Sequence, residues 1–169
     1  MNQEAEEITL EMIDHLESRL SIDPRRFYAM GVSMGGGSAL VFTGRHPVKV
    51  KAVCDVFGIT DYAKFHYQGS YNDSLKAAFG GSPLQQPKYY SERSAINYIN
   101  VLKNKPVLIL HGDQDAVVPQ SNSDDMVNKL TVAGGKVKYF VVPGMAHDNA
   151  IIKNLEHKVL NYLMGTESQ

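Results

Sequence analysis

Residues 27 to 40 decide the fold, and they read Phe-Tyr-Ala-Met-Gly-Val-Ser-Met-Gly-Gly-Gly-Ser-Ala-Leu. The apolar run from Phe27 to Val32 predicts a buried strand, and the small and apolar residues after Ser33 predict a helix. Between them, Gly31, Ser33 and Gly35 form the pattern Gly-x-Ser-x-Gly, in which a sharp strand-to-helix turn exposes the serine. Ser33 is therefore a candidate nucleophile.

The residue types around Ser33 suit that chemistry. A serine in such a turn has a strained backbone, and we expect side chains two positions away on either side to crowd it, so that Gly31 and Gly35 are required. We expect Gly36 and Gly37 to allow close backbone approach. The positive end of the helix dipole would face the position where negative charge develops during acyl transfer. The alternative for so short a motif is an ordinary turn with a surface serine.

Composition narrows the classes of partner. The 169 residues suit one compact domain, residues 1–169, and 17 basic against 18 acidic side chains give a net charge of -1. Because no basic stripe is present, we expect a small-molecule substrate and no nucleic acid. The single cysteine, Cys54, lies in an apolar run and is interpreted as a core residue.

No apolar stretch is long enough to span a bilayer, and residues 1–7 are acidic, unlike a signal peptide. We therefore expect no membrane partner. As written, the sequence favours a cytoplasmic protein; a secreted or periplasmic one is the alternative if an N-terminal part is missing.

The first half of the chain alternates helix and strand. Residues 3–20 have apolar side chains at helical spacing, and the strand at 27–32 is followed by a helix that ends near Gly44. Residues 50–57 form the next apolar run. Two strands joined by a helix predict parallel pairing.

The second half continues this order. Residues 106–111 read as a strand buried on both faces, a polar helix begins at Pro119, residues 136–142 are a last strand, and residues 149–164 are an amphipathic helix. The sequence thus predicts an α/β fold with an open, mostly parallel sheet of about four strands and flanking helices.

Residues 58–104 interrupt this order and are rich in Tyr, Ser, Asn, Gly and Pro, with one short helical piece at 74–79. We interpret them as a cap-like excursion or one wall of a pocket, and the alternative is a surface insertion. His66 and Tyr67 are candidate substrate contacts. The tyrosines between 62 and 98 are either an aromatic binding wall or the core of the cap.

Three chemically useful side chains follow three of the predicted strands. Ser33, Asp115 and His147 each lie just past a strand end, where the active residues of parallel sheets gather. Their order along the chain is the order found in α/β hydrolases. Asp113 is the alternative acid, although it is more typical of a turn residue.

Other titratable residues have ordinary interpretations. His15, His46 and His157 fall in helices or at a helix end and are expected on the surface. Asp55 and Asp61 flank the end of the second strand, where either lines the pocket or fixes a turn.

These motifs carry a family resemblance. The chain resembles the C-terminal part of an α/β-hydrolase-fold serine hydrolase, in the branch of dienelactone hydrolases, acetyl xylan esterases and prolyl oligopeptidases. The resembling residues are Asp23 to Arg26, Gly31 to Gly36, Lys105 to Gly112 with Asp115, Val118 and Pro119, and Gly144 to His147.

The resemblance implies a Ser-His-Asp hydrolase. Ser33 would be the nucleophile, His147 the base, Asp115 the acid and the backbone N–H of Met34 one oxyanion donor, while His111 would be structural. No metal or organic cofactor is implied. The leading hypothesis is a carboxylic ester hydrolase; the alternatives are a prolyl oligopeptidase-like peptidase and a truncated, non-catalytic module.

In the family, several strands come before the elbow, which is the turn at Gly31 to Gly35, and this chain lacks them. The strand at 27–32 would therefore have a bare, apolar edge, which promotes association. We expect a second copy of the chain to cover this edge, either by strand pairing or through the helix at 3–20, which would give a homodimer.

Overall fold

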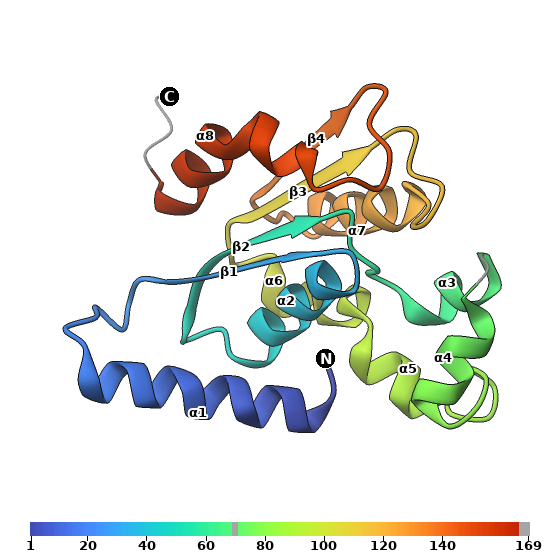
Figure 1. Ribbon diagram of the computed structural model, residues 1–169, viewed down its shortest axis with the longest axis horizontal. Helices are drawn as coiled ribbons and strands as arrows, with labels where there is room; N and C mark the ends of the chain where they lie inside the picture. The colour runs from blue at the N-terminus through green and yellow to red at the C-terminus, as the bar shows by residue number, and fades with distance from the viewer. Residues whose placement is uncertain (69–70, 166–169) are drawn as a thin grey trace.

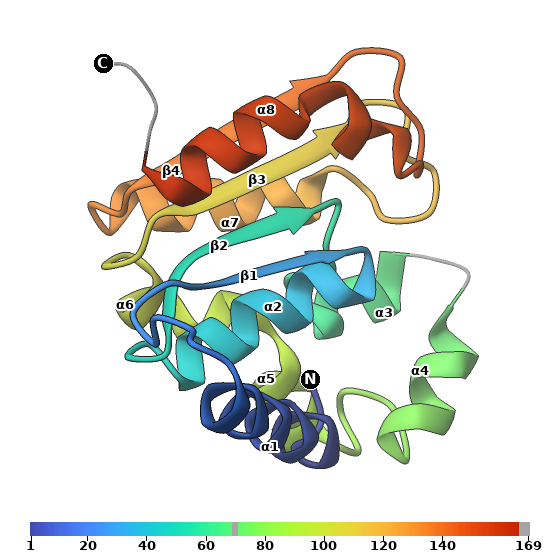
Figure 2. The ribbon, with the colours of Figure 1, turned by 60° about the vertical axis from the view of Figure 1, so that its left-hand side comes forward.

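The computed structural model describes residues 1–68 and 71–165. Four parallel strands form one sheet in the order β1-β2-β3-β4, and their arrowheads all point the same way (Figure 2). The strands are β1 (Phe27–Val32), β2 (Val50–Val56), β3 (Val107–Gly112) and β4 (Val137–Val142). The predicted four-stranded parallel α/β fold is confirmed.

Helices cover both faces of the sheet (Figure 1). One face packs against α8 (Ala150–Met164), and the other packs against α2 (Met34–Arg45) and α7 (Ser121–Val132). The N-terminal helix α1 (Gln3–Arg19) lies outside α2, where its Ile13 packs with Phe42 and Val50. The helix expected at 3–20 is present, but of its apolar residues only Ile13 is buried, whereas Ile8, Met12 and Leu20 are exposed.

The apolar runs of the inner strands follow from burial on both faces. Every residue of β3 is buried. Its alternate residues Val107 and Ile109 pack toward α2 and α7, whereas Leu108 and Leu110 pack toward α8. Because successive side chains of a strand point to opposite faces, a strand covered on both sides is apolar throughout.

β1 lies at one edge of the sheet. Within the described ranges its only strand partner is β2, and its residues are partly exposed, with Met30 40% exposed. The bare edge expected for this strand is therefore present.

The segment between β2 and β3 is more helical than predicted. Instead of one helical piece, its described residues form four α-helices and a short 3₁₀ helix: α3 (Tyr62–Gln68), α4 (Asn72–Phe79), α5 (Pro87–Arg93), η1 (Ala95–Tyr98) and α6 (Ile99–Leu102). The prediction failed because these elements are too short to show a helical period. Residues 69 and 70 of the predicted excursion lie outside the described residues.

Candidate active site

Ser33 occupies a strained turn between β1 and α2. Its backbone has φ 54° and ψ −124°, a conformation that non-glycine residues rarely adopt. Two backbone hydrogen bonds fix the turn: the N–H of Ser33 donates to the carbonyl of Val56 in β2 at 2.9 Å, and its carbonyl accepts from Gly36 at 3.0 Å. Strain of this kind persists where the surrounding structure imposes it, and it clusters at functional sites.

The glycines of the elbow act differently from one another. A Cβ on Gly31 would lie 2.1 Å from the carbonyl oxygen of Gly35, so the prediction for Gly31 is confirmed. The prediction for Gly35 was wrong, since a Cβ there meets nothing within 4 Å; its carbonyl, not its missing side chain, crowds the turn. Gly36 and Gly37 do permit close approach, because a Cβ on either would lie 2.0 Å from an oxygen of Asp55 or Ile59.

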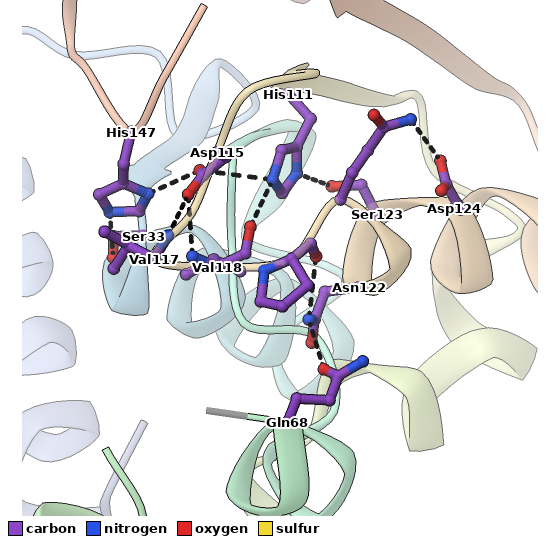
Figure 3. A network of polar contacts seen from close by, with 12 residues as sticks. Ser33, Gln68, His111, Asp115, Val117, Val118, Asn122, Ser123, Asp124 and His147 are labelled. Carbon is purple, nitrogen blue, oxygen red and sulfur yellow. Dashed lines mark hydrogen bonds and ion pairs between the residues drawn. The ribbon is translucent and has the colours of Figure 1, made fainter. Parts of the chain in front are cut away.

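The structure brings Ser33, His147 and Asp115 together from three loops (Figure 3). The Nε2 of His147 lies 3.0 Å from the Oγ of Ser33, and its Nδ1 lies 2.7 Å from the Oδ2 of Asp115. These loops follow β1, β4 and β3, whose carboxyl ends all lie at the same end of the sheet. With its Nδ1–H donated to Asp115, the imidazole leaves Nε2 free to accept the proton of Ser33.

Asp115 is held by donors on each of its oxygens. Its side chain has no exposed surface, and its Oδ1 accepts the backbone N–H groups of Val117 and Val118, each at 2.9 Å. Its Oδ2 lies 2.7 Å from Nδ1 of His147 and 3.4 Å from Nε2 of His111. A buried carboxylate with three donors is fully satisfied and rigidly placed.

Asp113, the alternative acid, has another role. Its Oδ1 accepts the backbone N–H of Gly144 at 2.7 Å, in the turn just before His147. The contact to the imidazole itself comes from Asp115. Asp113 therefore joins the loop after β3 to the loop after β4.

His111 is a buried hydrogen-bonding residue. Its Nδ1 lies 2.7 Å from the hydroxyl of Ser123, and its Nε2 lies 2.9 Å from the carbonyl of Val118 (Figure 3). Because a carbonyl only accepts, Nε2 carries the proton and Nδ1 accepts from Ser123. Burial lowers the pKa of His111, which favours this neutral form.

Phe57 was missed from the sequence. It follows β2 directly with φ 42°, and its buried ring lies 4.4 Å, centroid to centroid, from the ring of His147. It therefore supports one side of the imidazole. A phenylalanine at a strand end carries no signal of a left-handed backbone, so only the structure reveals this contact.

An apolar cavity of about 500 Å³ opens beside Ser33 and His147. It is lined by side chains from the β2–β3 segment and the loop after β3: Ile59, Tyr62, Phe65, Tyr71, Ser74, Leu75, Ala78, Phe79, Val117 and Val118, together with Met34. Met34 also begins α2, where the N–H has no partner within the helix.

His66 and Tyr67 are not part of this lining. His66 is buried, with its Nδ1 3.5 Å from the hydroxyl of Tyr90, and Tyr67 is 66% exposed. The structure instead brings their neighbours Tyr62 and Phe65 to the cavity. The aromatic residues of this segment therefore have two roles. Phe65 lines the cavity, whereas Tyr90 is in the buried cluster behind the lining that also contains Phe65.

The remaining candidates lie elsewhere. Asp61 accepts the backbone N–H of Lys64 at 3.0 Å at the start of α3, and Asp55 is fully buried beside the elbow. His15 and His157 are exposed, whereas His46 is partly buried and pairs with Glu6.

Residues 1–68 and 71–165 contain no group of three or more His, Cys, Asp or Glu side chains placed to hold a metal ion. Among the helices described there, none has the length and apolarity needed to cross a bilayer.

Comparison with known protein families matches residues 3–165 to the prolyl oligopeptidase family. A curated relative, the alpha/beta hydrolase domain-containing protein WAV2 of Arabidopsis thaliana, is 29% identical over 139 residues, which are 80% of this chain and 44% of that protein. The chain spans less than half the length of the curated relatives it matches.

Solved structures share the fold. A puromycin-hydrolyzing peptidase of Mycobacterium tuberculosis superposes with a TM-score of 0.77 and 26% identity, over 90% of this chain and 24% of that one. A truncated carbohydrate esterase from gut microbiota gives a TM-score of 0.75 and 24% identity, over 92% of this chain and 66% of that one.

Proposed function

The chain belongs to the prolyl oligopeptidase family, and on that premise we propose that it is a serine hydrolase that cleaves carboxylic esters through an acyl-enzyme. The observation that carries the proposal is the imidazole of His147, which lies within hydrogen-bond distance of both Ser33 and Asp115. An activated serine needs this chain of contacts.

The geometry suits each step of acyl transfer. Ser33 Oγ attacks the ester carbonyl as His147 Nε2 takes its proton, and Asp115 stabilises the resulting imidazolium. The carbonyl oxygen gains negative charge and is met by the N–H of Met34, a donor of the kind worth about 3 kcal/mol of barrier. The carbon–oxygen bond to the leaving alcohol then breaks, and His147 returns the proton to that alcohol. Water repeats the sequence and releases the acid.

The cavity favours an apolar acyl group. Apart from His147, the described residues that line it include no ionisable side chain other than the two tyrosines. A peptide in this space would bury amide groups that need hydrogen-bond partners, and the lining offers few of them. An ester of a short or medium alkyl acid makes no such demand.

A peptidase is the second candidate, favoured by the family and by a structural neighbour that is a peptidase. Initial rates on aryl acetate, butyrate and hexanoate esters, set beside a proline-containing peptide anilide, separate the two functions. We expect kcat/KM to rise with acyl length and the anilide to be inert, with Ser33→Ala as the blank. A larger kcat/KM on the anilide would replace the ester proposal, and no turnover at all would favour a non-catalytic module.

Two neighbouring alanines of α4 test whether the cavity holds the acyl group. Ala78 lines the cavity and Ala77 does not, although both are exposed. Ala78→Phe should lower kcat/KM on the hexanoate about tenfold relative to the acetate, because it fills the space for the longer chain. Ala77→Phe should leave that ratio as it was. Equal effects of the two variants would place the acyl group elsewhere.

We also propose that a second copy of the chain covers the edge of β1. Met30 on this strand and Met12 on α1 are 40% and 55% exposed, and an apolar cavity of about 390 Å³ between α1 and β1 includes both. Edge strands of this kind tend to pair. Light scattering at micromolar concentration should therefore give the mass of a dimer, and a clean monomer would contradict the proposal.

A further inference from the structure

Asp55 is a buried carboxyl group that acyl transfer does not use. Its side chain is completely buried, and neither carboxyl oxygen has a hydrogen-bond partner among the described residues. The backbone N–H of Gly58 lies near enough to favour the charged form, but without good hydrogen-bond geometry. An ionised carboxylate at this position lacks the partners that normally offset its loss of water.

The carboxyl group of Asp55 lies against the helix that carries the nucleophile. Asp55 pairs with Gly31 of β1 and with Ile109 of β3, on the face of the sheet that α2 covers. A Cβ on Gly36, in the first turn of α2, would lie 2.0 Å from Oδ1 of Asp55, and so would a Cβ on Gly58. The carboxyl group therefore fills the space between these two glycines.

This position couples the charge of Asp55 to the reacting atoms. Gly36 donates its N–H to the carbonyl of Ser33 and lies two residues after Met34, the proposed oxyanion donor. A negative charge against this turn would oppose the positive end of the helix dipole and repel the developing oxyanion. A protonated carboxyl group in the same space does neither.

We propose that Asp55 is a positioning residue that works as an uncharged acid: its protonated carboxyl group packs the first turn of α2 against Gly58, and loss of the proton weakens the oxyanion hole. The proposal rests on the proposed hydrolase function. Burial raises the pKa of Asp55 to about 7, so its charge changes within the range of an ordinary assay. The rate should therefore fall as the pH rises through this range.

Other titratable groups near Asp55 do not reproduce this effect. The neighbouring elements contribute Cys54 of β2, His111 of β3, Asp124 of α7 and Tyr139 of β4, whereas the first turn of α2 and Gly31 of β1 contribute none. Burial raises the pKa of Cys54 to about 12 and also raises that of Tyr139. Burial lowers the pKa of His111. An alkaline fall near neutrality therefore points to Asp55.

The test is the rate of labelling by a serine-reactive fluorophosphonate across about pH 6 to 9, read by intact mass. Asp55→Asn keeps the shape of the side chain and removes its proton equilibrium. In the unsubstituted chain we expect the rate constant to pass through a maximum and fall about tenfold by the alkaline end, whereas Asp55→Asn stays level there. Asp61→Asn is the matched control and should keep the fall; Ser33→Ala gives the blank.

A second measurement does not depend on the variant folding. The side-chain carboxyl carbon of Asp55, followed by NMR in the unsubstituted chain, should titrate near pH 7. Three results would overturn the proposal: Asp55 already ionised at about pH 5, no fall of the labelling rate at alkaline pH, or a fall that persists in Asp55→Asn. In each of these cases labelling of Ser33 would still support the hydrolase function. No labelling at any pH would overturn both.

Discussion

The side chains of Asp115 and Asp55 are both fully buried, near the carboxyl ends of neighbouring strands, yet their surroundings are opposite. Asp115 receives the N–H groups of Val117 and Val118 and the imidazole of His147. Asp55 has no hydrogen-bond partner among the described residues. Burial therefore sets the cost of a charge, while the available donors decide whether the site keeps that charge.

The difference originates in the backbone. Asp115 lies in a turn beyond β3, where N–H groups released from the sheet can point at a side chain. Asp55 lies within β2, paired on both sides with Gly31 and Ile109, so the backbone around it is already used by the ladder. A position that is still within the ladder therefore offers little to a carboxylate.

The largest expected effect is at Asp115. Asp115→Asn should lower kcat/KM on the aryl esters by roughly 10³ to 10⁴, because an amide no longer holds the imidazole in the tautomer that accepts the serine proton. Asp113→Asn should cost far less, since the partner of Asp113 among the described residues is the backbone N–H of Gly144 and not the imidazole. Circular dichroism checks that both variants fold. If Asp115→Asn lowered kcat/KM by less than tenfold, Asp115 would not hold the imidazole, and its role would no longer differ from that of Asp55.

The second effect is on stability and belongs to Asp55. Its pKa is raised to about 7 in the folded state, so the unfolded chain loses this proton first as the pH rises. Between about pH 4 and pH 7 the folded state then binds more protons than the unfolded chain, so the contribution of Asp55 to the free energy of unfolding falls. Above about pH 7 this contribution is constant. The fall is about 4 kcal/mol.

Urea unfolding at about pH 5 and about pH 8 measures this contribution as the difference between the unsubstituted chain and Asp55→Asn, which cannot ionise. As the pH rises, the free energy of unfolding of the unsubstituted chain should fall relative to that of Asp55→Asn. An unchanged difference would mean that Asp55 is ionised throughout, as a well-partnered carboxylate would be.

The smallest effects come from two adjacent glycines of α2. Gly36→Ala should destabilise the fold by about 1–3 kcal/mol, because its Cβ would meet the carboxyl group of Asp55, and Asp55→Ala should relieve part of that cost. Gly35→Ala places its Cβ in open space and should stabilise by about 0.5–1 kcal/mol. Thermal unfolding measures the stability of each variant, and equal changes in Gly36→Ala and Gly35→Ala would contradict the placement of Asp55 against Gly36.

The strands and the elbow could be predicted because their signals are local. The apolar run predicted the bounds of β1 as the structure has them, and the glycine and serine pattern located the turn. The proximity of Ser33, Asp115 and His147 followed from topology, since parallel strands bring their carboxyl ends to one edge.

What failed depended on tertiary contacts. In the seven residues of α3, Tyr62 and Phe65 share the face that lines the cavity, whereas His66 and Tyr67 were predicted to do so. So short a helix shows no period from which its inner face can be assigned. The burial of Asp55 was equally hidden, because it depends on which layer covers its side of β2.

An activated Ser33 should react with a serine-directed fluorophosphonate. The folded chain is treated with a fluorophosphonate near neutral pH beside Ser33→Ala, and the intact mass of each is recorded. We expect one label on the unsubstituted chain and none on the variant. A folded chain that takes no label, or a label that persists in Ser33→Ala, would show that Ser33 is not an activated nucleophile.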